Sequence, residues 1–159
     1  MRTLIVYYSK YGFTKECAEN LRNNIKGEVK LVHINEDYKY DLSYYDNIVI
    51  GSAVYMGMIN GRIKDFCVKN KDVLKDKKTY LFLCSGVRSN FELYLEQNLE
   101  KEFVDMLEYK DHFGGELRMD KLSFMDKMIA KMASRAHKDS EKPTLMIENI
   151  NKFILEINK

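Results

Sequence analysis

The sequence predicts an α/β fold in which helices cover both faces of a parallel β-sheet. Segments of strand length alternate along the chain with segments that repeat apolar residues at helical spacing, which is the pattern of connected βαβ units. Two of the strand segments, Asn47–Ser52 and Tyr80–Ser85, are nearly continuous apolar runs, as strands buried on both faces require. We therefore expect a doubly wound sheet in a single domain over residues 1–159.

The first strand leads through a short turn directly into a helix. Thr3–Tyr8 is rich in β-branched and aromatic residues, and helical periodicity begins near Thr14. A helix that begins at the carboxyl end of a strand directs unpaired N–H groups and the positive end of its dipole toward the crevice, which favours an anion. Ser9 and Thr14 add hydroxyl donors, and Gly12 lets the backbone approach a ligand. The turn is predicted to hold a phosphate; the alternative is an ordinary turn in which Thr14 only caps the helix.

Strands and helices continue to alternate through the rest of the chain. Further strands are expected at Glu28–Ile34, Asn47–Ser52, Tyr80–Ser85 and, more briefly, His112–Arg118. Helices are expected at Gly61–Lys69, Phe91–Leu107 and Thr144–Ile157, the last of them after Pro143.

Composition and charge argue against several classes of protein. The chain has no long uncharged apolar run, so a membrane-spanning helix is not expected. Its formal charge of +2 gives no general attraction to nucleic acid. Cys17, Cys67 and Cys84 are odd in number and far apart, which favours reduced thiols in a cytoplasmic protein. The histidines show no metal-ligand spacing, so we expect no metal site.

The segment Ile5–Thr14 resembles the phosphate loop of the flavodoxin family. It lacks the glycine spacing of the Walker and dinucleotide-binding loops. Its apolar, aromatic, hydroxyl and glycine positions instead follow the flavodoxin signature, which continues to Ala18 and Leu21. The resemblance implies a flavodoxin-like five-stranded parallel sheet of order 2-1-3-4-5 with FMN bound beside the first strand. A module of this fold that binds no flavin is a further, less favoured alternative.

Two more loops leave predicted strands at the same edge of the sheet. In the flavodoxin family the loops that correspond to Gly51–Gly57 and Ser85–Asn90 hold the isoalloxazine ring. Tyr55 and Met56 offer a wall for a planar, partly apolar ring; the alternative is that both pack onto the following helix. No catalytic residue is predicted. The cofactor-binding residues that the resemblance implies are Ser9, Lys10, Tyr11, Gly12, Phe13, Thr14, Ser52, Ala53, Val54, Tyr55, Met56, Gly57, Ser85, Gly86, Val87, Arg88, Ser89 and Asn90.

The last third of the chain resembles a narrower group, the flavodoxin-like menaquinone-dependent protoporphyrinogen oxidases. The resemblance rests on Phe113–Arg118 and on the basic, methionine-rich segment Lys121–Lys138, which is expected to form an inserted helix. Such a helix has an apolar stripe and a positive face. It can therefore meet anionic lipid at the inner face of the membrane, the carboxylates of a porphyrin precursor, or the protein's own core.

These resemblances imply an FMN-dependent oxidoreductase that dehydrogenates protoporphyrinogen IX and passes the electrons to a quinone. The alternative is a flavodoxin that carries electrons between protein redox partners and turns over no small substrate. Carrier flavodoxins are usually strongly acidic, so the balanced charge of this chain favours the oxidase over the carrier.

Overall fold

A twisted parallel sheet forms the centre of the molecule. The computed structural model describes residues 1–36, 39, 41–115, 120–121, 123–136 and 144–159. The parallel strands have the order β2-β1-β3-β5-β6, and β4 pairs antiparallel with the end of β3. The predicted flavodoxin-like order is thereby confirmed. The strands are β1 (Arg2–Tyr8), β2 (Glu28–His33), β3 (Asn47–Tyr55), β4 (Met58–Ile59), β5 (Lys78–Cys84) and β6 (Tyr109–His112).

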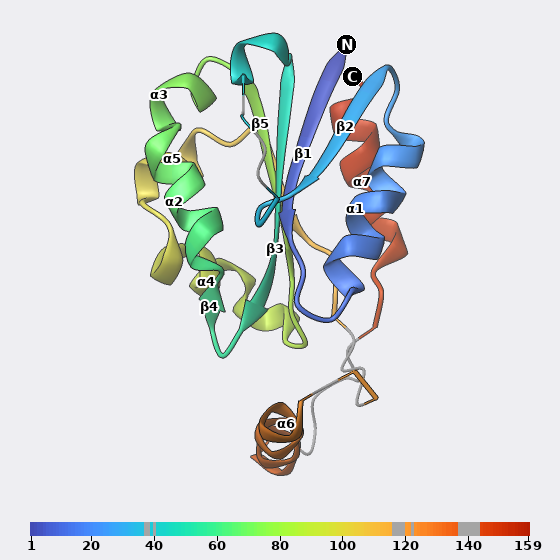
Figure 1. The fold of residues 1–159 in the computed structure, drawn as a ribbon, viewed down its shortest axis with the longest axis vertical. Coiled ribbons are helices and arrows are strands. Elements are labelled where there is room, and N and C mark those ends of the chain that lie inside the picture. The colour runs from blue at the N-terminus through green and yellow to red at the C-terminus, as the bar shows by residue number, and fades with distance from the viewer. Residues whose placement is uncertain (37–38, 40, 116–119, 122, 137–143) are drawn as a thin grey trace.

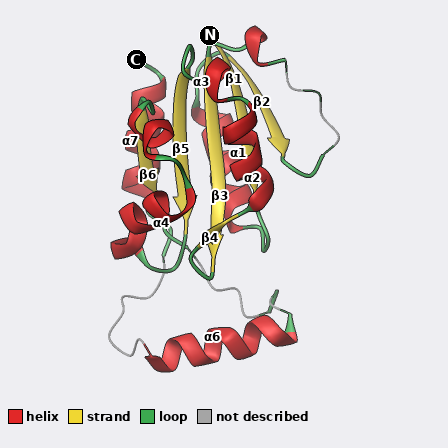
Figure 2. Ribbon diagram, turned by 90° about the vertical axis from the view of Figure 1, so that its left-hand side faces the viewer, coloured by secondary structure: helices red, strands yellow, loops and turns green. Residues whose placement is uncertain are grey.

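Helices cover both faces of this sheet. Two of them, α1 (Phe13–Asn24) and α7 (Ile147–Ile157), lie on one face, and four lie on the other (Figure 1). A further helix, α6 (Phe124–Ala136), runs across the carboxyl ends of the strands and stands apart from both layers (Figure 2). The four helices of the second face are α2 (Gly61–Lys69), α3 (Lys71–Leu74), α4 (Phe91–Asn98) and α5 (Lys101–Asp105), and the short 3-10 turns are η1 (Leu42–Tyr44) and η2 (Arg88–Asn90).

The apolar core forms two layers, one on each side of the sheet. Successive strand residues point to opposite faces, so Leu4 packs in the layer beneath α2 to α5 and Ile5 in the layer beneath α1 and α7. In the second layer the rings of Phe82 and Phe113 stack with their centroids 4.5 Å apart. Gly51 makes room for Phe82, because a Cβ at that position would lie 2.2 Å from the ring. This packing holds the carboxyl ends of β1, β3 and β5 together at one edge.

The prediction of a last strand at His112–Arg118 is wrong, because β6 ends at His112. Beyond it the chain adopts a positive φ of 84° at Gly114 and leaves the sheet. Gly114 instead forms an isolated antiparallel bridge with Leu145. The rest of that predicted strand, Glu116–Arg118, lies outside the described residues, as do Pro143 and the end of the predicted helix at Lys138.

The expected helix Phe91–Leu107 is interrupted, and α4 and α5 are separate. Leu99 and Glu100 have extended backbone conformations, which ends α4 at Asn98. The Asn98 side chain donates to the carbonyls of Tyr94 and Gly57, both at 2.9 Å. An asparagine that bonds to backbone groups in this way competes with helix continuation, and here it also ties α4 to the hairpin after β3.

Other element boundaries differ less. The helix at Gly61–Lys69 has the predicted bounds. The final helix begins at Ile147 rather than Thr144, because the residue pair formed by Gly114 and Leu145 occupies that stretch. β3 extends beyond Ser52 to Tyr55, where it pairs with the unpredicted β4.

Candidate cofactor site

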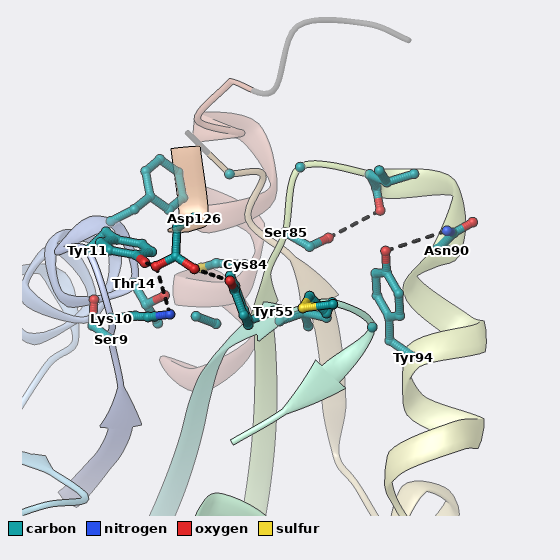
Figure 3. Close-up of a pocket in the computed structure, with 18 of the residues that line it drawn as sticks. Ser9, Lys10, Tyr11, Thr14, Tyr55, Cys84, Ser85, Asn90, Tyr94 and Asp126 are labelled. Atoms are coloured by element: carbon teal, nitrogen blue, oxygen red, sulfur yellow. Dashed lines mark hydrogen bonds and ion pairs between the residues drawn. The ribbon is translucent and has the colours of Figure 1, made fainter. Parts of the chain in front are cut away.

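A cavity of about 430 Å³ opens at the carboxyl edge of the sheet (Figure 3). The loops that follow β1, β3 and β5 form its walls, and α6 contributes from above. Ligands of doubly wound sheets bind at this edge, and the volume lies in the range of small-molecule sites. The lining residues are Ser9, Lys10, Tyr11, Phe13, Thr14, Ala53, Val54, Tyr55, Met56, Gly57, Cys84, Ser85, Gly86, Val87, Asn90, Tyr94, Gly115, Asp126 and Ile129.

The loop after β1 is shaped as an anion cradle. Gly12 is the N-cap of α1 with a φ of 94°, and no side chain caps the helix. Ser9 Oγ accepts a hydrogen bond from the Gly12 N–H at 3.1 Å, and the first helical bond runs from Glu16 N–H to the Gly12 carbonyl. The N–H groups between them have no partner within the helix. With the buried Thr14 hydroxyl at the cavity wall, this loop fits a phosphate group.

The loop after β3 is a tight hairpin that presents Tyr55 and Met56. Tyr55 pairs with Met58 across the hairpin, and the two residues between them, Met56 and Gly57, both have positive φ, at 50° and 77°. Positive φ at both loop positions is typical of a type I′ turn, and it is uncommon for methionine. The Met56 side chain is 70% exposed. For Met56, this exposure argues against the alternative in which Tyr55 and Met56 both pack onto the following helix.

His112 makes hydrogen bonds that position the loop after β5. The Gly114 N–H donates to His112 Nδ1 at 3.2 Å, which assigns the ring proton to Nε2. His112 Nε2 lies 2.8 Å from Ser85 Oγ, and that hydroxyl donates to the Val87 carbonyl. Gly115 packs on the same loop, since a Cβ there would lie 2.5 Å from the Ser85 carbonyl carbon. Burial lowers the pKa of His112, and the positive charge of Arg88 lowers it further.

This lowered pKa predicts a loss of stability in mild acid. Above the ordinary histidine pKa, near 6.5, both the folded and the unfolded chain hold His112 neutral. Below it the unfolded chain binds the proton first, so the free energy of unfolding falls as the pH falls. Urea unfolding of wild type and His112→Gln between about pH 7.5 and about pH 5 should therefore show a steeper fall for wild type. Parallel curves for the two proteins would exclude this role for His112.

A carboxylate from α6 joins two of the three loops. Asp126 accepts hydrogen bonds from the Tyr11 and Tyr55 hydroxyls, and its Oδ2 lies 3.1 Å from Lys10 Nζ (Figure 3). Its side chain is 9% exposed. The Lys10 ammonium also lies 3.9 Å from the centroid of the Tyr55 ring, which is cation–π distance. Asp126 thus sits among one cation and two phenol donors at the mouth of the cavity.

Most of the predicted cofactor residues come together at this cavity, and four do not line it. Gly12 is the N-cap of α1 and does not itself line the cavity. Arg88 and Ser89 belong to the 3-10 turn η2, which follows β5. The Ser52 hydroxyl is fully buried and donates to the Ala53 carbonyl at 2.9 Å. The cavity also includes residues that the sequence did not indicate: Cys84, Tyr94, Gly115, Asp126 and Ile129.

The cysteines are free thiols inside the protein. Cys17, Cys67 and Cys84 are all buried, each as a free thiol. Burial raises the pKa of the Cys67 thiol to about 12. Burial and the neighbouring Cys17 thiol raise the pKa of Cys84 well above its usual range. Cys84 therefore reaches the cavity wall as a neutral thiol.

Fold and site together define an α/β protein of the doubly wound class with a phosphate-binding cradle at the first strand. The chain belongs to the flavodoxin family, because a family model described as "Flavodoxin domain" matches residues 4–144. A flavodoxin of Aquifex aeolicus is 32% identical over 79 residues, which cover 47% of this chain and 41% of that protein. The match thus spans less than half of that relative.

Solved structures agree with this assignment. A flavoprotein of Lactobacillus acidophilus, solved in complex with FMN, is 25% identical, with a TM-score of 0.51 over 70% of this chain and 90% of that one. A short-chain flavodoxin associated with a bacterial microcompartment is 13% identical, with a TM-score of 0.61 over 99% of this chain and 96% of that one. At that identity the second likeness supports the fold alone.

The residues that the structure describes contain neither a candidate membrane-spanning helix nor a candidate metal-binding cluster. No helix among them is both long and apolar enough to cross a membrane. No group of three or more histidine, cysteine, aspartate or glutamate side chains in the same part of the chain is placed to hold a metal ion.

Proposed function

We propose that this protein is an FMN-binding electron carrier that exchanges electrons with protein partners. The observation that carries the proposal is the uncapped start of α1, turned toward a cavity at the carboxyl edge of the sheet in a flavodoxin-family chain. FMN is the cofactor of that family site, as in the Lactobacillus structure solved with it. When bound, FMN supplies the redox chemistry.

The chain's own residues bind and orient the cofactor. The N–H groups of the first turn of α1, together with the hydroxyls of Ser9 and Thr14, hold the phosphate. Lys10 belongs to the same loop, and its positive charge, which is paired with Asp126 at 3.1 Å, favours a phosphate over a neutral group. Tyr55 and the loop at Ser85–Asn90 provide opposite walls for the isoalloxazine ring.

The carrier role is supported better than the oxidase role by the Aquifex and Lactobacillus relatives, which are named as a flavodoxin and a flavoprotein. The chain differs from acidic carriers in its formal charge of +2. Lys121, just before α6, and Lys127, on α6, are both exposed. Complementary charge guides the encounter of redox proteins, so the partner proposed for this carrier presents an acidic surface.

The protoporphyrinogen oxidase is a second candidate, and one observation favours it. α6 lies over the carboxyl edge of the sheet, and the side chains of Phe124, Met125 and Met132 are 68 to 77% exposed. An exposed apolar stripe with lysines beside it is typical of a helix that lies on an anionic membrane surface. A membrane-bound quinone would then be near the flavin.

One experiment separates the two functions. The purified protein should be yellow or become so with FMN, take electrons from a flavoprotein reductase, and reduce cytochrome c. The protein should oxidise protoporphyrinogen no faster than free FMN does. The apoprotein, assayed in the same way, serves as the control. Quinone-coupled oxidation above that background would favour the oxidase. Binding of the protein to anionic vesicles would also favour the oxidase, provided that the Lys127→Gln variant binds more weakly. The binding should also weaken above about 0.15 M salt, where the Debye length is about 8 Å.

A further inference from the structure

We propose that Asp126 is a latch that holds α6 over the mouth of the cavity and thereby slows the exchange of the cofactor. Its carboxylate attaches this helix to two loops of the flavin site. The part of the inference that concerns cofactor exchange rests on the proposed function. The attachment itself does not.

The Asp126 carboxylate bonds to residues of two loops of the site. Lys10 Nζ lies 3.1 Å from Oδ2, and the hydroxyls of Tyr11 and Tyr55 both donate to the carboxylate. Lys10 and Tyr11 follow β1, whereas Tyr55 ends β3. Hydrogen bonds to an ionised acceptor are stronger than neutral ones. A carboxylate that is 9% exposed needs such partners, because burial of an unpaired charge is costly.

Several apolar side chains of α6 are exposed. Phe124, Met125, Met128 and Met132 are 51 to 77% exposed, so the apolar stripe of this helix does not hold it against the sheet. Among the α6 side chains that the structure describes, those of Asp126 and Ile129 line the cavity. Among the described side chains of α6, Asp126 therefore contributes more to docking than apolar packing does.

A capping role has to be separated from the latch. Ser123 Oγ accepts a hydrogen bond from the Asp126 N–H at 3.2 Å and donates to Asp126 Oδ2 at 2.8 Å. The Lys127 N–H donates to the Ser123 carbonyl. Ser123 and Asp126 thus form a capping arrangement at the start of α6. That arrangement alone would stabilise the first turn without attaching the helix to the loops.

The test uses four proteins: wild type, Asp126→Asn, Ser123→Ala and Asp120→Asn. Asp120 is exposed and lies just before α6, so Asp120→Asn makes the same change of charge without the contacts to the loops. Ser123→Ala removes the capping hydroxyl and keeps the carboxylate. Hydrogen exchange of α6 is measured in the apoprotein, and the rate of FMN release is measured by the recovery of flavin fluorescence.

Asp126→Asn should increase exchange along the whole of α6 and release FMN about tenfold faster, because the ion pair with Lys10 is lost and the remaining hydrogen bonds are weakened. Ser123→Ala should affect exchange in the first turn alone, and Asp120→Asn should match wild type. Unchanged α6 exchange in Asp126→Asn would overturn the latch. Unchanged or slower FMN release would overturn its effect on the cofactor, since the carboxylate would then compete with the phosphate for Lys10. If no variant binds FMN, the proposed function fails, while exchange in the apoprotein still decides the latch.

Discussion

Replacement of Ser9 by Ala together with Thr14 by Val is expected to weaken FMN binding by about 3 to 6 kcal/mol. Each hydroxyl would donate to a charged phosphate, and a hydrogen bond to a charged group contributes about 1.5 to 3 kcal/mol. Both residues line the cavity beside the start of α1. Valine has nearly the shape of threonine, so the buried position of Thr14 stays filled. Titration of the apoprotein with FMN, followed by flavin fluorescence, measures the effect.

Riboflavin provides the matched control for this prediction. It has the same ring and no phosphate, so its affinity should be nearly the same in wild type and in the double variant. Equal loss of FMN and riboflavin affinity would instead mean that the substitutions disturb the loop. Unaltered FMN affinity would place the phosphate elsewhere in the cavity.

The cradle and the three loops could be predicted from the sequence because their causes are local. An apolar strand, a glycine and a helix start stand next to one another between Ile5 and Thr14. The second and third loops follow strands of the same parallel sheet, and topology alone brings their ends to one edge. At the break, by contrast, Asn98 contacts Gly57, which is 41 residues away in the sequence. No periodicity within α4 indicates that contact.

The contribution of α6 could not be predicted for the same reason. Asp126 is 116 residues from Lys10 in the sequence, and its spacing after Ser123 indicates a helix cap and nothing more. The methionine stripe did indicate a helix, but it did not indicate what the helix covers. A pattern of apolar residues defines a face; the partner of that face depends on the path of the chain in three dimensions. Here the charged side chain of Asp126 bonds the helix to the loops after β1 and β3.

Tyr55→Ala is expected to weaken FMN binding by about 1 to 3 kcal/mol, the range measured for aromatic stacking on a nucleic-acid base. The Tyr55 ring lines the cavity at the end of β3. Its loss should also relieve the quenching of bound flavin, so fluorescence per bound FMN should rise.

Tyr55→Phe separates the ring from its hydroxyl. Phenylalanine keeps the aromatic wall but cannot donate to Asp126, so equilibrium affinity and quenching should stay close to wild type while FMN release becomes faster. An alanine variant with normal quenching would assign the stacking to Tyr11 or Phe13, which line the same cavity. A phenylalanine variant as weak as alanine would mean that the hydroxyl, and not the ring, is the part of Tyr55 that matters to the flavin. The Lys10 ammonium lies 3.9 Å from the Tyr55 centroid and occupies one side of the ring. A flavin that stacks on Tyr55 would therefore use the opposite side.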